Sequence, residues 1–125
     1  MALILVVEDD PDNQDVLTTM LQIAGHTTIL ASNGAEALKL AVEKHPALIL
    51  MDMGLPVMDG WTATAQLKAH PRLMTIPIVA VTSYAMTEDA QRARSVGCTD
   101  YIAKPIDYVV LITKIAALLP HQYTV

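Results

Sequence analysis

The sequence has one cysteine, few basic residues and no long apolar run, and each shortage excludes a class of protein. Cys98 alone cannot form an internal disulfide, which fits a reducing compartment. Eight Lys and Arg against thirteen Asp and Glu give a net charge of −5, without the basic cluster that a nucleic-acid-binding surface requires. The apolar run at residues 2–7 is too short to span a bilayer and ends in acids. We therefore expect a soluble, cytoplasmic protein that binds neither nucleic acid nor membrane.

Apolar sequence is abundant: 53% of the 125 residues are hydrophobic and 17% are charged. This balance excludes a disordered chain, and the length is sufficient for one hydrophobic core. Phenylalanine is absent, and we expect the seven methionines to fill gaps in that core. The sequence predicts a single domain over residues 1–125, with its core in 2–119 and a short C-terminal tail at 120–125.

Short apolar runs alternate with segments of helical spacing five times along the chain. Near-continuous apolar runs such as "LILM" and "IVAV" indicate strands that are buried on both faces. Strict alternation of strand and helix indicates a parallel sheet with helices on both sides, so we predict a doubly wound α/β domain. The expected strands are 2–7, 27–31, 47–51, 76–81 and 99–103, and the expected helices are 11–24, 34–44, 60–69, 87–96 and 108–119.

Residues that can bind an ion, a phosphate or a proton follow four of the five expected strands, and the second strand is followed only by Ser32 and Asn33. Ligands of such sheets bind at the carboxyl ends of the strands, near the point where strand order reverses. A single residue of this kind is explained by helix capping, as we expect for Asp10, but the joint pattern is not. These residues are Glu8, Asp9 and Asp10 after the first strand, Asp52 after the third, Thr82 and Ser83 after the fourth, and Lys104 after the fifth.

The acidic residues among them predict a metal ion. Glu8, Asp9 and Asp52 are expected to converge, and Lys104 offsets only one of their charges. Oxygen ligands without His or Cys suit Mg²⁺, which keeps water ligands that a substrate phosphate can replace. Lys104 and the Thr82 hydroxyl are the right types to hold phosphoryl oxygens. Asp52 is then either a third metal ligand or a nucleophile that forms an aspartyl phosphate.

Four stretches of the sequence resemble the receiver domain of two-component response regulators, and the order in which they occur is that of the family. The resemblance is to the single-domain receivers of the chemotaxis-regulator type. The resemblance covers residues 2–119 and implies a flavodoxin-like (βα)5 fold with strand order 2-1-3-4-5. It also implies Mg²⁺-dependent transfer of a phosphoryl group from a histidine kinase or phosphotransfer protein, and control of a downstream output protein. The stretches are "ILVVEDDPDNQ" (4–14), "LILMDMGLPVMDG" (48–60), "IPIVAVTSYAM" (76–86) and "GCTDYIAKPID" (97–107).

The resemblance implies a role for each acid at the predicted site. Asp52 matches the phosphoacceptor, and Glu8 and Asp9 match the acid pair that positions Mg²⁺. The backbone carbonyl of Gly54 matches a main-chain ligand of the same ion. Gly54 and Tyr84 occupy two positions that influence how water reaches the aspartyl phosphate, and we predict that Tyr84 partly shields it.

The same resemblance implies a conformational switch. Thr82 matches a hydroxyl that moves toward the phosphoryl group, and Lys104 matches the lysine that pairs with it. Tyr101 matches an aromatic residue that changes rotamer on phosphorylation, altering the surface formed by the fourth helix, fifth strand and fifth helix. The Lys104–Pro105 bond is expected to be cis. Ser83 stands where the family often has Ala, and it is small enough for Thr82 to move.

Other functions remain as alternatives. An aspartyl-phosphate phosphatase of the dehalogenase type requires a second Asp two residues after its nucleophile, where this chain has Gly54. A phosphorylation-independent interaction module would need no intact site. A flavodoxin would place a flavin phosphate against an acidic loop that repels it. The sequence names neither the kinase nor the output, and it leaves both a monomer and a phosphorylation-dependent dimer open.

Overall fold

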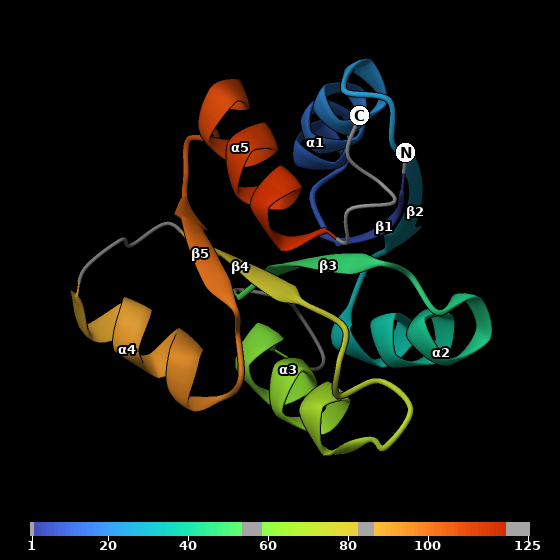
Figure 1. Cartoon of the computed structure of the whole chain (residues 1–125), viewed down its shortest axis with the longest axis vertical. Coiled ribbons are helices and arrows are strands. Elements are labelled where there is room, and N and C mark those ends of the chain that lie inside the picture. Colours follow the sequence, from blue (N-terminus) through green and yellow to red (C-terminus); the bar gives the residue numbers. More distant parts are fainter. Residues whose placement is uncertain (1, 54–58, 83–86, 120–125) are drawn as a thin grey trace.

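The structure, a computed structural model, describes residues 2–53, 59–82 and 87–119. Within these residues the chain forms one parallel five-stranded sheet with the strand order β2-β1-β3-β4-β5 (Figure 1). The predicted order is therefore confirmed. The strands are β1 (Leu3–Val7), β2 (Thr27–Ala31), β3 (Leu48–Asp52), β4 (Ile78–Thr82) and β5 (Asp100–Ala103).

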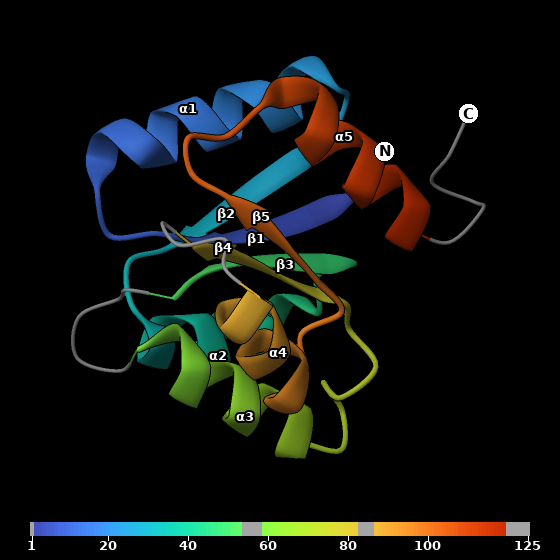
Figure 2. The ribbon, with the colours of Figure 1, turned by 90° about the vertical axis from the view of Figure 1, so that its left-hand side faces the viewer.

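Helices cover both faces of the sheet, as the alternating sequence pattern predicts. Figure 2 shows α1 and α5 on one face and α2, α3 and α4 on the other. Each face has its own core: Leu21 and Ile115 are fully buried under the first pair, and Ala41 and Leu67 under the other three helices. The helices are α1 (Pro11–Ile23), α2 (Gly34–Lys44), α3 (Gly60–Ala69), α4 (Thr87–Ser95) and α5 (Tyr108–Leu118).

Side-chain caps fix where four of these helices begin. Each capping residue precedes the helix in extended backbone, and its side-chain oxygen accepts a hydrogen bond from a backbone N–H in the first turn. The role expected for Asp10 is confirmed, so this acid is used by the fold. The capping side chains and the residues whose N–H they accept from are Asp10 with Asp12, Asn33 with Glu36, Asp59 with Thr62, and Asp107 with Val110.

The predicted ends of the third and fourth strands were each one residue too early, and the residues concerned belong to the site. Asp52 and Thr82 were expected to follow their strands, but each is the last residue of its strand. The ladders continue through them, because Asp52 is paired in register with Val81 and Thr82 with Ala103. Both residues are therefore fixed by the sheet rather than by a loop.

The start of β4 was also predicted too early. The strand begins at Ile78 rather than at residue 76, because Pro77 has no N–H to give to a ladder. The carbonyl of Pro77 still accepts a hydrogen bond of 3.0 Å from the N–H of Ile49. Among the described residues, no helix is long and apolar enough to cross a membrane.

Candidate phosphoacceptor and metal site

Asp52 stands at the carboxyl end of β3, the central strand of the sheet. The neighbouring strands are β1 and β4, and the residue is only 8% exposed. A carboxylate in such a position is costly unless cations or hydrogen-bond donors compensate its charge. The surrounding residues show how this compensation is arranged.

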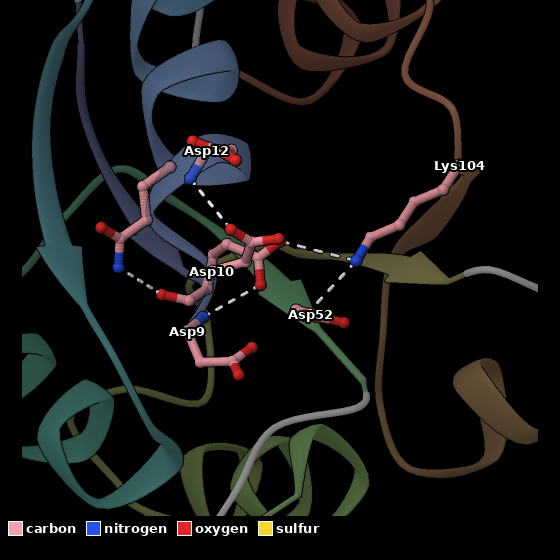
Figure 3. A network of polar contacts seen from close by, with 7 residues as sticks. Asp9, Asp10, Asp12, Asp52 and Lys104 are labelled. Carbon is pink, nitrogen blue, oxygen red and sulfur yellow. Dashed lines mark hydrogen bonds and ion pairs between the residues drawn. The ribbon is translucent and has the colours of Figure 1, made fainter.

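Two further carboxylates converge on Asp52, as the sequence predicts. Glu8 and Asp9 follow β1, and one carboxylate oxygen from each of the three acids lies within 4.8 Å of the others (Figure 3). Glu8 is 1% exposed, whereas Asp9 is open to solvent. The cluster is thus buried at its base and accessible at one side.

Lys104 is shared between two of these acids. Its Nζ lies 3.4 Å from Asp52 Oδ2 and 3.5 Å from Glu8 Oε1 (Figure 3). The backbone anchors this residue, because the Lys104 N–H donates a 2.8 Å hydrogen bond to the Thr82 carbonyl. The Lys104–Pro105 peptide bond is cis, the isomer that the family resemblance implied. One ammonium therefore faces three carboxylates and pairs with two of them.

The raised pKa of Glu8 shows that Lys104 does not compensate all the negative charge of the cluster. Burial first and the neighbouring Asp52 carboxyl second raise the pKa of Glu8, and Lys104 lowers it by less, so that together they bring it to about 7. A site that disfavours its own charge in this way favours an additional cation. The ligand atoms available are carboxylate oxygens, which are the ligands that Mg²⁺ takes together with water. Glu8, Asp9 and Asp52 therefore fit a Mg²⁺ ion.

A residue that the sequence interpretation did not assign to the site helps to fix Glu8. The Gln14 side-chain Nε2, from α1, donates a 2.6 Å hydrogen bond to the Glu8 carbonyl. The N–H of Asp9 donates to Glu8 Oε2 at 2.9 Å. Gln14 lies one helical turn after Asp10, and a polar side chain at that spacing was the available signal. These bonds hold the β1–α1 turn against the cluster.

Gly60 begins α3, and its lack of a side chain also lets α3 lie close to the backbone of Asp52. The N–H of Gly60 donates a 3.3 Å hydrogen bond to the Met53 carbonyl. A Cβ atom at Gly60 would overlap the carbonyl oxygen of Asp52 and lie 2.6 Å from Met53 Cα. The first turn of α3 can therefore approach the backbone of Asp52 only because residue 60 has no side chain.

The structure places only some of the predicted switch residues. Thr82 is the last residue of β4 and is 9% exposed. It directly follows Val81, which is paired in register with Asp52. Tyr101 is half-buried on the edge strand β5 and packs against the core of the α2–α4 face. Gly54, Ser83 and Tyr84 lie outside the described residues, so the predictions about them stay predictions.

Comparison with known proteins identifies the family that this geometry belongs to. The sequence model of the response regulator receiver domain matches residues 4–116. The polar-differentiation response regulator DivK of Brucella ovis is 41% identical over 116 residues, which are 93% of this chain and 94% of DivK.

Two solved structures are also similar. The signal receiver domain of a histidine kinase from Syntrophus aciditrophicus has a TM-score of 0.89 and 34% identity, covering 100% of this chain and 95% of that one. The receiver domain of a sensor histidine kinase from Pseudomonas aeruginosa has a TM-score of 0.87 and 35% identity, covering 94% and 96% of the two chains, and it holds a magnesium ion in its active-site cleft. The sheet order, the acidic cluster and these matches together show that the chain belongs to the response regulator receiver domains, which are generally signalling proteins of two-component systems and not classical enzymes.

Proposed function

We propose that Asp52 accepts a phosphoryl group and that Glu8, Asp9 and Asp52 hold the Mg²⁺ ion that this reaction needs. The observation that supports this most directly is the position of Lys104, whose single ammonium is shared by Asp52 and Glu8 at 3.4 and 3.5 Å. The Gly54 carbonyl is proposed as a further ligand on the basis of the sequence alone.

The proposed reaction is an in-line displacement at phosphorus. A carboxylate oxygen of Asp52 forms a new P–O bond, while the P–N bond of a phosphohistidine or the P–O bond of a small acyl phosphate breaks. The released imidazole or carboxylate keeps the electron pair of the broken bond. Lys104 would exchange its carboxylate partners for a phosphoryl oxygen. When bound, Mg²⁺ supplies neutralisation of the charge on the transferred group.

The chain would thus catalyse only its own phosphorylation and dephosphorylation. We propose a histidine kinase or a histidine phosphotransfer protein as the donor, because receiver domains in two-component systems work with such partners. Residues 2–119 would act as one unit, and the cytoplasm is the proposed compartment. The unpaired Cys98 supports that placement.

Phosphorylation is proposed to change the surface formed by α4, β5 and α5. Thr82 and Lys104 would move toward the new dianion, and Tyr101 would then change its position. An output protein would read the altered surface. The energy available for this change is only the difference in phosphoryl contacts between the two arrangements.

The test is the intact mass of the protein after incubation with acetyl phosphate, with Mg²⁺ or with chelator. A gain of one phosphoryl group that requires Mg²⁺ and is absent from Asp52→Asn is the expected result. Lack of any gain has two explanations, rapid hydrolysis or phosphorylation-independent binding. Beryllofluoride, a stable mimic of the phosphoryl group, separates them: binding that requires Asp52 supports the proposal, and no binding overturns it.

A further inference from the structure

Lys114 on α5 contacts Tyr101 on the edge strand β5 in two ways. Its Nζ lies 3.0 Å from the backbone carbonyl oxygen of Tyr101 and 5.3 Å from the centroid of the Tyr101 ring. The second distance is within the range of a cation–π interaction. Figure 2 shows α5 on the face of the sheet opposite to α2, α3 and α4, and Tyr101 packs against the core on their side. Because β5 is an edge strand, Lys114 reaches Tyr101 past the edge of the sheet.

A carboxylate on the same strand fixes Lys114 in this position. Asp100 Oδ1 lies 3.0 Å from Lys114 Nζ and also accepts a 2.8 Å hydrogen bond from the N–H of Tyr101. Both backbone polar groups of Tyr101 are therefore occupied by side chains. Lys114 and Asp100 are each about one-third exposed, at 32% and 31%, so water weakens the ion pair without removing its geometric effect.

We propose that Lys114 is a positioning residue that sets the resting place of the Tyr101 ring and so the threshold of the phosphorylation switch. This inference rests on the proposed function, which gives Tyr101 its role in that switch. In the structure described, Lys104 pairs with Asp52 and Glu8, and the Lys114 cation lies beside the Tyr101 ring. Movement of the ring by a few ångströms would lose the cation–π contact and leave the two contacts to the backbone intact.

A contact made in only one of two arrangements shifts the equilibrium toward that arrangement. A partly exposed cation–π contact corresponds to about a two- to fivefold change in an equilibrium constant. Lys114→Met keeps the length of the side chain and removes its charge. We expect this variant to need about two- to fivefold less beryllofluoride for half-saturation in the presence of Mg²⁺.

The experiment follows two signals during a beryllofluoride titration. Backbone amide spectra report binding at Asp52, and fluorine spectra of protein labelled with 3-fluorotyrosine report the Tyr101 ring, with Tyr101→Phe used to assign its signal. Lys114→Arg should restore the wild-type half-saturation, because it retains the cation. Lys39→Met on α2 makes the same change of charge at an exposed position away from β5 and should have no effect.

A double-mutant cycle separates the ring contact from a general structural effect of Lys114. In a Tyr101→Leu background the ring is absent, so Lys114→Met should no longer change the half-saturation. An unchanged half-saturation in Lys114→Met, or an equal shift in the Tyr101→Leu background, would show that Lys114 only protects the strand edge and would overturn the inference. Beryllofluoride binding without a change in the Tyr101 signal would refute the switch role of Tyr101, and absence of binding would refute the proposed function itself.

Discussion

The Lys104 ammonium lies 3.4 Å from the Asp52 carboxylate, although Asp52 ends β3, Lys104 directly follows β5, and β4 lies between these two strands. The contact spans that strand because Lys104 is anchored to it through the Thr82 carbonyl. The same ammonium reaches Glu8 at the end of β1. One cation thus connects the carboxyl ends of β1, β3 and β5.

Removing this cation should destabilise the metal-free protein. Lys104→Met would leave Glu8 and Asp52 buried without their shared partner. Loss of one partner of a fully buried pair costs about 3–5 kcal/mol, and because Lys104 is one-quarter exposed we expect about 1–3 kcal/mol. Urea unfolding in chelator measures the effect, with Lys39→Met as the control that removes an exposed charge. Equal stability of wild type and Lys104→Met would show that the pair is compensated by water.

Neutralising Glu8 should have the opposite effect on the metal-free protein. The raised pKa of Glu8 means that its surroundings disfavour the negative charge, so Glu8→Gln should increase the unfolding free energy at pH 8 in chelator. The magnitude expected is about 1–2 kcal/mol, because the Gln side chain gives up the pairing with Lys104. Thermal unfolding with and without Mg²⁺ provides the check. Wild type should gain more stability from Mg²⁺ than the variant, and an equal gain would exclude Glu8 from the metal site.

Most of the fold and the main site residues were predictable because both depend on local patterns. Uninterrupted apolar runs mark strands that are buried on both faces, and polar residues at the ends of such runs meet at one edge of a parallel sheet. Lys104 was expected to offset the charge of one acid, but its ammonium pairs with two. Which acids it contacts depends on how its backbone is anchored to β4 through the Thr82 carbonyl. Gly60 could not be interpreted from sequence either, since its role depends on how closely α3 approaches Asp52. Lys114 and Tyr101 are thirteen residues apart, and their contact is set by how α5 packs.

Protonation of His26 should oppose folding in mildly acidic solution. The N–H of Ala2 donates a 3.2 Å hydrogen bond to His26 Nδ1, which must be unprotonated to accept it, and burial lowers the pKa of His26 below its ordinary value of 6.5. A depressed folded-state pKa contributes stability that is present above the unfolded value and lost as pH falls toward the folded one. The contribution of His26 to the unfolding free energy should therefore decrease below about pH 6.5, whereas Glu8, with its raised pKa, contributes in the opposite direction over the same range. His26→Asn keeps an acceptor and cannot protonate, so the unfolding free energy of wild type relative to this variant should fall between pH 7.5 and 5.5, while the Glu8 contribution is common to both proteins. Parallel pH profiles for both proteins would contradict this assignment.

Gly60→Ala tests whether the approach of α3 to Asp52 matters for the site. The added methyl group would meet the Asp52 carbonyl and the Met53 backbone, so we expect a loss of about 1–3 kcal/mol of stability together with a displaced acceptor. Phosphorylation by acetyl phosphate should slow on the order of tenfold, because small displacements of a reacting group are costly. Gly25→Ala is the matched control: its methyl group meets nothing within 4 Å, but its φ of +94° makes the substitution strained. That control should lose stability and keep the wild-type phosphorylation rate. If the two variants lose stability equally and neither slows phosphorylation, the close approach of α3 has no part in positioning Asp52.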